Sequence, residues 1–100
     1  MSNEDLIITD NEFLRQYETT VNEELATIEY SRQERKVFLT KLHMSESVRE
    51  QGYMEKFIEA VLEEIQESNT RVMPTSPEIA KYMRKNRRKY KDLLPVGINI

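Results

Sequence analysis

The most informative segment of this 100-residue chain is Met44-Ser-Glu-Ser-Val-Arg-Glu-Gln-Gly-Tyr-Met-Glu-Lys-Phe-Ile58. It follows an apolar, strand-like run over residues 37–42 and leads into a long amphipathic pattern. A strand, a polar loop with Arg49 and Gly52, and a helix start would bring unbonded backbone N–H groups to the positive end of a helix dipole. Such an arrangement can bind an anion, for example a phosphate. An ordinary capped helix explains the same residues, so both interpretations stay open at this point.

The amphipathic pattern after this loop predicts one helix from about Ser47 to Glu67. Its apolar residues recur at helical spacing, which is typical of a helix that packs one face against a sheet. These residues are Tyr53, Phe57, Ile58, Val61, Leu62 and Ile65. The opposite face is rich in glutamate, and we expect it to be solvated.

The rest of the chain predicts strands and a second helix. Alternating or β-branched residues predict strands over residues 11–20, 25–30 and 36–44, with a turn at Asn22-Glu23 and a polar link over residues 31–35. Short connections favour an antiparallel meander, and residues 6–8 suggest a short additional edge strand. A fourth strand, residues 71–73, ends at Pro74, and Pro77 suits the first turn of a helix with Ser76 as its N-cap.

The predicted fold class is therefore α+β: an antiparallel strand meander, a long amphipathic helix, a fourth strand and a short C-terminal helix. One hundred residues predict a single domain over residues 1–100. The chain is 33% charged and 38% hydrophobic, and no run approaches the roughly 18 apolar residues of a membrane span. There is no cysteine and one histidine, His43, which argues against disulfides and zinc sites. We expect a cytoplasmic protein with no metal and no membrane contact.

Charge is distributed unevenly along the chain. The net charge is −3, yet residues 81–91 contain seven basic residues and no acidic one. This basic segment is explained by a solvated helix face, or by a site for a polyanion such as nucleic acid, with Tyr82 and Tyr90 available for stacking. The overall acidity and the glutamate-rich helix count against nucleic acid.

Two motifs resemble the small, single-domain GNAT-type (GCN5-related) N-acetyltransferases, and the resemblance covers residues 11–94. The family pattern Arg/Gln-x-x-Gly-x-Gly/Ala is matched at Arg49 and Gly52, while Met54 stands where a small residue is usual. Residues 72–84 resemble the family's strand that ends in a proline and a Cys-containing turn, followed by a helix with a tyrosine. The matching positions are Pro74, Pro77, Ala80, Tyr82 and Arg84, and Ser76 replaces the cysteine.

The resemblance implies a minimal acyl-CoA-binding core that uses acetyl-CoA as cosubstrate and an amine, on a small molecule or a protein, as acceptor. The pantetheine arm would pair with the backbone at the end of the third strand, and the pyrophosphate would meet the N–H groups of residues 50–54. We also expect basic residues of the second helix to lie near the nucleotide, because the turn at Pro74–Pro77 places that helix beside the adjoining strand. The implied cofactor-binding residues are Leu42, Met44, Arg49, Glu50, Gln51, Gly52, Tyr53, Met54, Lys85 and Arg88.

Three residues are candidates for catalysis. His43 is the one side chain whose unperturbed pKa lies near neutrality, so it could be the base that deprotonates the amine. Ser76 stands in place of the family's cysteine, and Tyr82 could protonate the leaving thiolate. Each has a structural alternative: a solvent-facing strand histidine, a helix N-cap and a core aromatic residue, respectively.

A rival hypothesis is a non-catalytic acyl-CoA-binding or protein-interaction module on the same fold. Three departures from the family pattern favour it: Met54, Ser76, and Lys41, which stands where the family often has a histidine.

Overall fold

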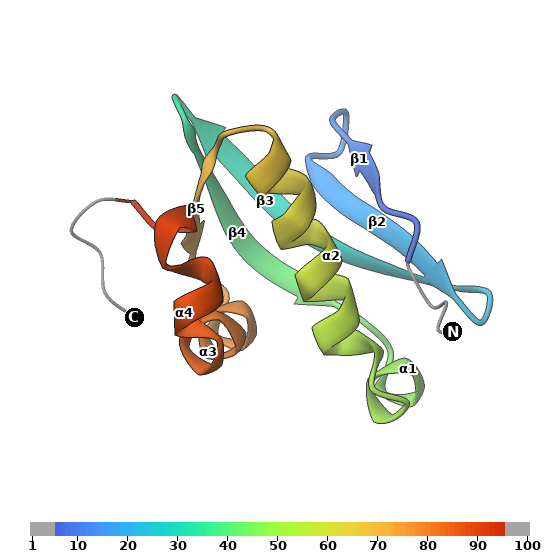
Figure 1. Cartoon of the computed structure of the whole chain (residues 1–100). Coiled ribbons are helices and arrows are strands. Elements are labelled where there is room, and N and C mark those ends of the chain that lie inside the picture. Colours follow the sequence, from blue (N-terminus) through green and yellow to red (C-terminus); the bar gives the residue numbers. More distant parts are fainter. Residues whose placement is uncertain (1–5, 96–100) are drawn as a thin grey trace.

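A computed structural model describes residues 6–95, so the ends of the predicted domain lie outside the described residues. The chain forms a five-stranded sheet with α2 lying across β3 and β4, and with α3 and α4 beside α2 at the β5 end (Figure 1). The elements are β1 (Thr9–Asn11), β2 (Gln16–Val21), β3 (Glu24–Gln33), β4 (Lys36–His43), α1 (Glu46–Glu50), α2 (Tyr53–Glu67), β5 (Arg71–Pro74), α3 (Pro77–Lys85), α4 (Arg87–Tyr90) and the 3-10 helix η1 (Lys91–Leu93). The predicted α+β class is confirmed.

The strand order is β1-β2-β3-β4-β5, and β1 to β4 pair antiparallel, as the predicted meander requires. The turn at Asn22-Glu23 joins β2 to β3 with both residues at positive φ (52° and 67°), the conformation of a two-residue hairpin turn that follows the sheet twist. β5 pairs parallel to β4, because the helical connection returns the chain to the same end of the sheet.

The predicted continuous strand over residues 11–20 is wrong. A turn over residues 12–15 divides it into β1 and β2. The side-chain oxygen of Asn11 accepts the N–H of Leu14 (3.1 Å), a local bond that favours a turn over a strand. The edge strand begins at Thr9, after the expected residues 6–8. β3 is longer than predicted, since three of the five residues of the polar link, residues 31–33, still pair with β4.

The predicted single helix from Ser47 to Glu67 is also wrong, because the chain breaks at Gln51-Gly52 between α1 and α2. Gly52 has φ +88°, which an α-helix cannot contain and which glycine adopts at no steric cost. The short helix α1 is capped by Ser45, whose hydroxyl accepts the N–H of Val48 (3.2 Å). The break gives α2 its own N-terminus at Tyr53.

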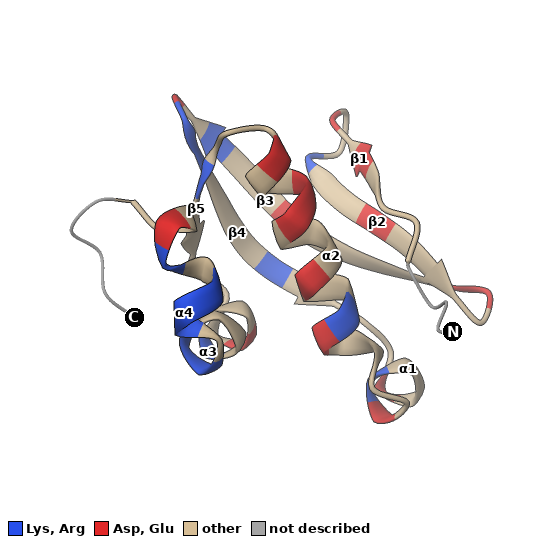
Figure 2. Cartoon of the chain, in the orientation of Figure 1, with Lys and Arg blue, Asp and Glu red and all other residues tan. Residues whose placement is uncertain are grey.

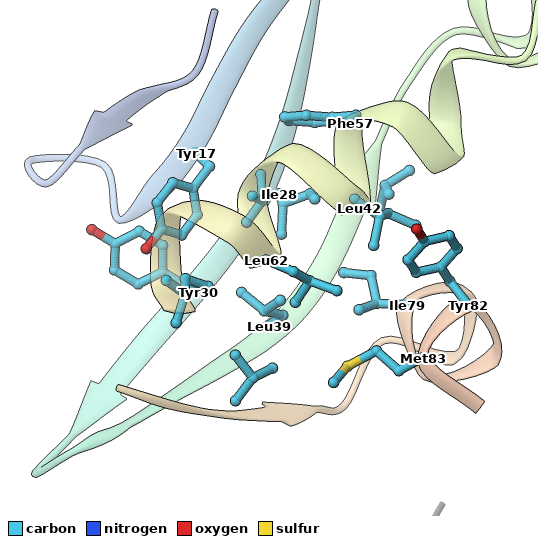
Figure 3. Close-up of a cluster of buried hydrophobic side chains, with 14 of the residues drawn as sticks. Tyr17, Ile28, Tyr30, Leu39, Leu42, Phe57, Leu62, Ile79, Tyr82 and Met83 are labelled. Carbon is cyan, nitrogen blue, oxygen red and sulfur yellow. The ribbon is translucent and has the colours of Figure 1, made fainter. Parts of the chain in front are cut away.

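The core lies between α2 and the sheet (Figure 3). The predicted apolar face of α2 is buried from Phe57 to Ile65, with Phe57 and Leu62 fully inaccessible, whereas Tyr53 is partly buried. Its acidic face is not simply solvated, as the sequence suggested, since Glu55 and Glu59 bond to lysines of α3 and α4. Within residues 6–95 no helix is both long and apolar enough to span a membrane.

Candidate functional site

β4 and β5 part at Leu39, whose partner Pro74 is the last paired residue of β5. The Leu39 carbonyl accepts the N–H groups of Thr75 (3.1 Å) and Ser76 (2.9 Å) and the Thr75 hydroxyl (2.9 Å). These bonds anchor the turn that leads β5 into α3. The β3–β4 ladder shifts register at the same level, between Glu29 and Tyr30. Beyond Leu39, β4 continues to His43, and β3 is its only strand partner among the described residues.

The start of α2 lies just after this stretch of β4 and has no side-chain cap. The N–H groups of Gln51 and Gly52 are already used, since they donate to the carbonyls of Val48 (3.2 Å) and Arg49 (3.0 Å). The N–H groups at the start of α2 that can bind an anion are therefore those from Tyr53 onward. The predicted anion site over residues 50–54 is correspondingly reduced to its last two residues. A Cβ atom added to Gly52 would meet no heavy atom within 4 Å, so the space beside this backbone is open.

Arg49 connects three elements at this place. Its Nε donates to the Met44 carbonyl (3.0 Å) after β4, its Nη1 contacts the Met54 sulfur (3.5 Å) in α2, and it forms an ion pair with Glu78 of α3. The guanidinium is thus held beside the first turn of α2. The sequence predicted no role for Glu78 at this site, and its pairing with Arg49 was missed because the two residues are 29 positions apart.

His43 lies on the sheet face that α2 does not cover. Its neighbour Leu42 is buried in the core, whereas the His43 side chain is 54% exposed, as alternation along a strand requires. His43 Nε2 lies 2.5 Å from a carboxylate oxygen of Glu29 on β3. Glu29 was not predicted from the sequence. The signal was present in strand alternation, because Glu29 lies between the inward-facing residues Ile28 and Tyr30.

Ser76 and Tyr82 lie on the helix side of the sheet, inside the core. Ser76 is only 2% exposed and occupies the N-cap position of α3, but its side chain makes no capping hydrogen bond, in contrast to the predicted structural role. The Tyr82 hydroxyl lies 3.4 Å from that of Tyr90, and burial is the main cause that raises the pKa of Tyr82 above its ordinary value. Tyr82 belongs to the buried cluster with Ile79 and Met83 (Figure 3).

Comparison with known proteins identifies the family of this chain. The sequence pattern of the GCN5-related N-acetyl-transferase family matches residues 16–93, which is most of the chain. The chain belongs to this family. A GCN5-like protein from Staphylococcus aureus, whose solution structure was determined by NMR, has the same fold with a TM-score of 0.65. It is 23% identical, and the match covers 97% of this chain and 94% of that one. No curated protein sequence matches the chain.

In this member of the GCN5-related N-acetyl-transferase family, the candidate residues lie in two places. Arg49, Gly52 and the start of α2 lie together, and Lys85 joins them through a bond to Glu55 in the first turn of α2 (3.0 Å). His43 and Glu29 lie on the uncovered sheet face. Residues 6–95 contain no group of three or more histidine, aspartate or glutamate side chains placed to hold a metal ion.

Proposed function

We propose that this chain binds acetyl-CoA where β4 and β5 part and transfers the acetyl group to an amine. The observation that supports it most directly is the uncapped start of α2, with open space beside Gly52 and Arg49 alongside. Backbone N–H groups at a helix start and a neighbouring guanidinium are what a pyrophosphate requires. Membership of an acetyltransferase family supports the same assignment.

The types of residue at the site suit the chemical groups of acetyl-CoA. The N–H groups of Tyr53 and Met54, with Arg49, would hold the pyrophosphate. The edge of β4 at Leu42 and Met44 would pair with the amide groups of pantetheine. One lone pair of the Met44 carbonyl is already taken by Arg49, so the Met44 contact depends on its other lone pair or on its N–H. Bound acetyl-CoA supplies an activated thioester carbonyl.

The chain's own residues would handle the protons. An amine must lose a proton before it attacks, and His43 lies exposed at the end of β4 with Glu29 to orient its ring. The other ring nitrogen of His43 is then the one directed at the acceptor. Tyr82 lies on the opposite side of the sheet, where a leaving thiolate would need a donor. The base would act on the attacking amine and the acid on the leaving sulfur, which are different substituents of the tetrahedral intermediate, so the two groups need not come from the same face of the sheet.

The test of binding is a matched pair of variants at Gly52. Asn and Asp both tolerate a left-handed backbone and have nearly the same shape, so Gly52→Asn and Gly52→Asp share any strain and differ in charge. Titration with acetyl-CoA, followed by amide NMR signals, should shift residues 42–44 and 53–55 in the wild type. Gly52→Asp should bind at least about fivefold more weakly than Gly52→Asn. Equal affinity of the two variants would show that no phosphate lies there.

A second candidate function is acyl-CoA binding without catalysis. It is favoured by the burial of both Ser76 and Tyr82, which are 2% and 8% exposed. Acetyl-CoA incubated with a panel of primary amines distinguishes the two. Release of CoA above the buffer rate supports the transferase, whereas tight binding with no release from any amine supports the binding module.

A further inference from the structure

The basic segment of residues 81–91 comprises the second half of α3, the junction at Asn86, the whole of α4 and the start of η1. Figure 2 shows its lysines and arginines gathered on α3 and α4, which lie beside the glutamate-rich helix α2. The proposed function assigns no role to most of these positively charged side chains.

Two of the lysines are engaged with α2. Lys85 bonds to Glu55 (3.0 Å) and Lys89 bonds to Glu59 (2.6 Å). Glu55 lies in the first turn of α2 and Glu59 one turn later, so the two pairs fasten the basic segment beside the start of that helix. The segment is thereby held next to the proposed pyrophosphate site.

The junction between α3 and α4 is hollowed. Asn86 leaves helical geometry (φ −116°, ψ 41°), and its side chain donates to the Tyr82 carbonyl (2.9 Å), which ends α3 and lets α4 begin in a new direction. Residues 84–89 line a surface hollow of about 530 Å³ at this bend. Arg84 and Arg88 lie on its wall, one from each helix, and within residues 6–95 neither side chain forms an ion pair.

We propose that this hollow binds the 3′-phosphate of the CoA nucleotide through Arg84 and Arg88, with Lys85 and Lys89 holding the helices in place. This rests on the proposed function, because it requires acetyl-CoA at the start of α2. The 3′-phosphate is a monoester that is close to a dianion at neutral pH, and it extends beyond the pyrophosphate on the ribose. Guanidinium groups are well suited to phosphate oxygens. In this proposal Arg84 and Arg88 contact the phosphate, and Lys85, which the sequence predicts as a cofactor-binding residue, holds α3 beside α2 through its bond to Glu55.

The experiment compares CoA with dephospho-CoA by calorimetry at low ionic strength. The wild type should bind CoA about 3- to 10-fold more tightly than dephospho-CoA, the range expected for two exposed charge contacts. In Arg84→Gln/Arg88→Gln this ratio should fall to about one, with dephospho-CoA affinity unchanged. The matched control is Lys81→Gln/Lys91→Gln, which removes the same charge from exposed positions outside the hollow and should keep the wild-type ratio.

Other outcomes overturn the proposal. Equal affinity of the wild type for both ligands, or an equal loss in both double variants, shows that the hollow does not bind the 3′-phosphate although CoA still binds. Failure of both ligands to bind the wild type refutes the proposed function, and this site with it. A labelled single-stranded oligonucleotide is the remaining probe: if Arg84→Gln/Arg88→Gln loses it while the CoA ratio stays unchanged, the hollow is a nucleic-acid site.

Discussion

Glu78→Gln should increase the affinity for acetyl-CoA. Glu78 forms an ion pair with Arg49, the cation that we expect to contact the pyrophosphate. A phosphate on Arg49 would lie roughly 6 Å from that carboxylate, and two unit charges at this separation repel by about 1 kcal/mol at an effective dielectric constant near 50. Glutamine keeps the shape and one oxygen acceptor but removes the charge. The dissociation constant should therefore fall about fivefold.

The cost to folding should be small. The two side chains are 32% and 38% exposed, and an ion pair in such surroundings contributes about 0.2–1 kcal/mol. Calorimetric titration with acetyl-CoA measures the affinity, and denaturant unfolding without ligand measures the stability. The control is Asp10→Asn, which removes one negative charge from an ion pair with Arg32 at another part of the sheet. If Glu78→Gln binds acetyl-CoA no more tightly than Asp10→Asn, then Arg49 does not meet the phosphate.

Three further outcomes are expected. His43→Ala should lower the rate of acetyl transfer by about 10²–10⁴-fold with cofactor affinity unchanged. Glu29→Gln should lower that rate less, because Glu29 only orients the ring. Equal turnover of wild type and His43→Ala would exclude His43 as the base. Burial is the main cause that raises the pKa of Tyr17 from 10 to about 12, so the folded state keeps a proton that the unfolded state loses. Stability should therefore fall by up to about 2 kcal/mol between pH 10 and 12 through this residue, and Tyr17→Phe, followed by denaturant unfolding at several alkaline pH values, should show a shallower fall. Phe57→Ala should destabilise the fold by about 3–5 kcal/mol, because Phe57 is fully buried on the sheet-facing side of α2. A loss below about 1 kcal/mol in the same assay would mean that the core is packed differently.

The sequence by itself determined those features that depend on neighbouring residues. Strand alternation and the Asn22-Glu23 turn predicted the meander, and helical spacing predicted the buried face of α2, including Phe57. The order of a strand, a polar loop with a glycine, and a helix predicted where an anion could bind. Each of these signals is local, since periodicity and turn chemistry act over a few residues.

Some local features were nevertheless predicted wrongly. The helix break at Gly52 was missed because the helical pattern that begins at Tyr53 was extended back to Ser47, over residues without an apolar spacing of their own. The turn over residues 12–15 was missed because Phe13 and Tyr17 share the parity of a strand, although the structure leaves Phe13 93% exposed. In both cases a single backbone preference, the left-handed φ of Gly52 and the side-chain bond from Asn11, outweighed the hydrophobic pattern.

Only the tertiary structure decided which residues meet. Arg49 pairs with Glu78, His43 with Glu29, and Lys85 with Glu55, over separations of 29, 14 and 30 positions. The chain has 18 acidic residues, and no local pattern selects a partner for each cation among them. The selection follows from strand register and from the packing of α3 against α2. These long-range contacts are set by burial of the apolar faces, and the charged groups meet where that packing brings them.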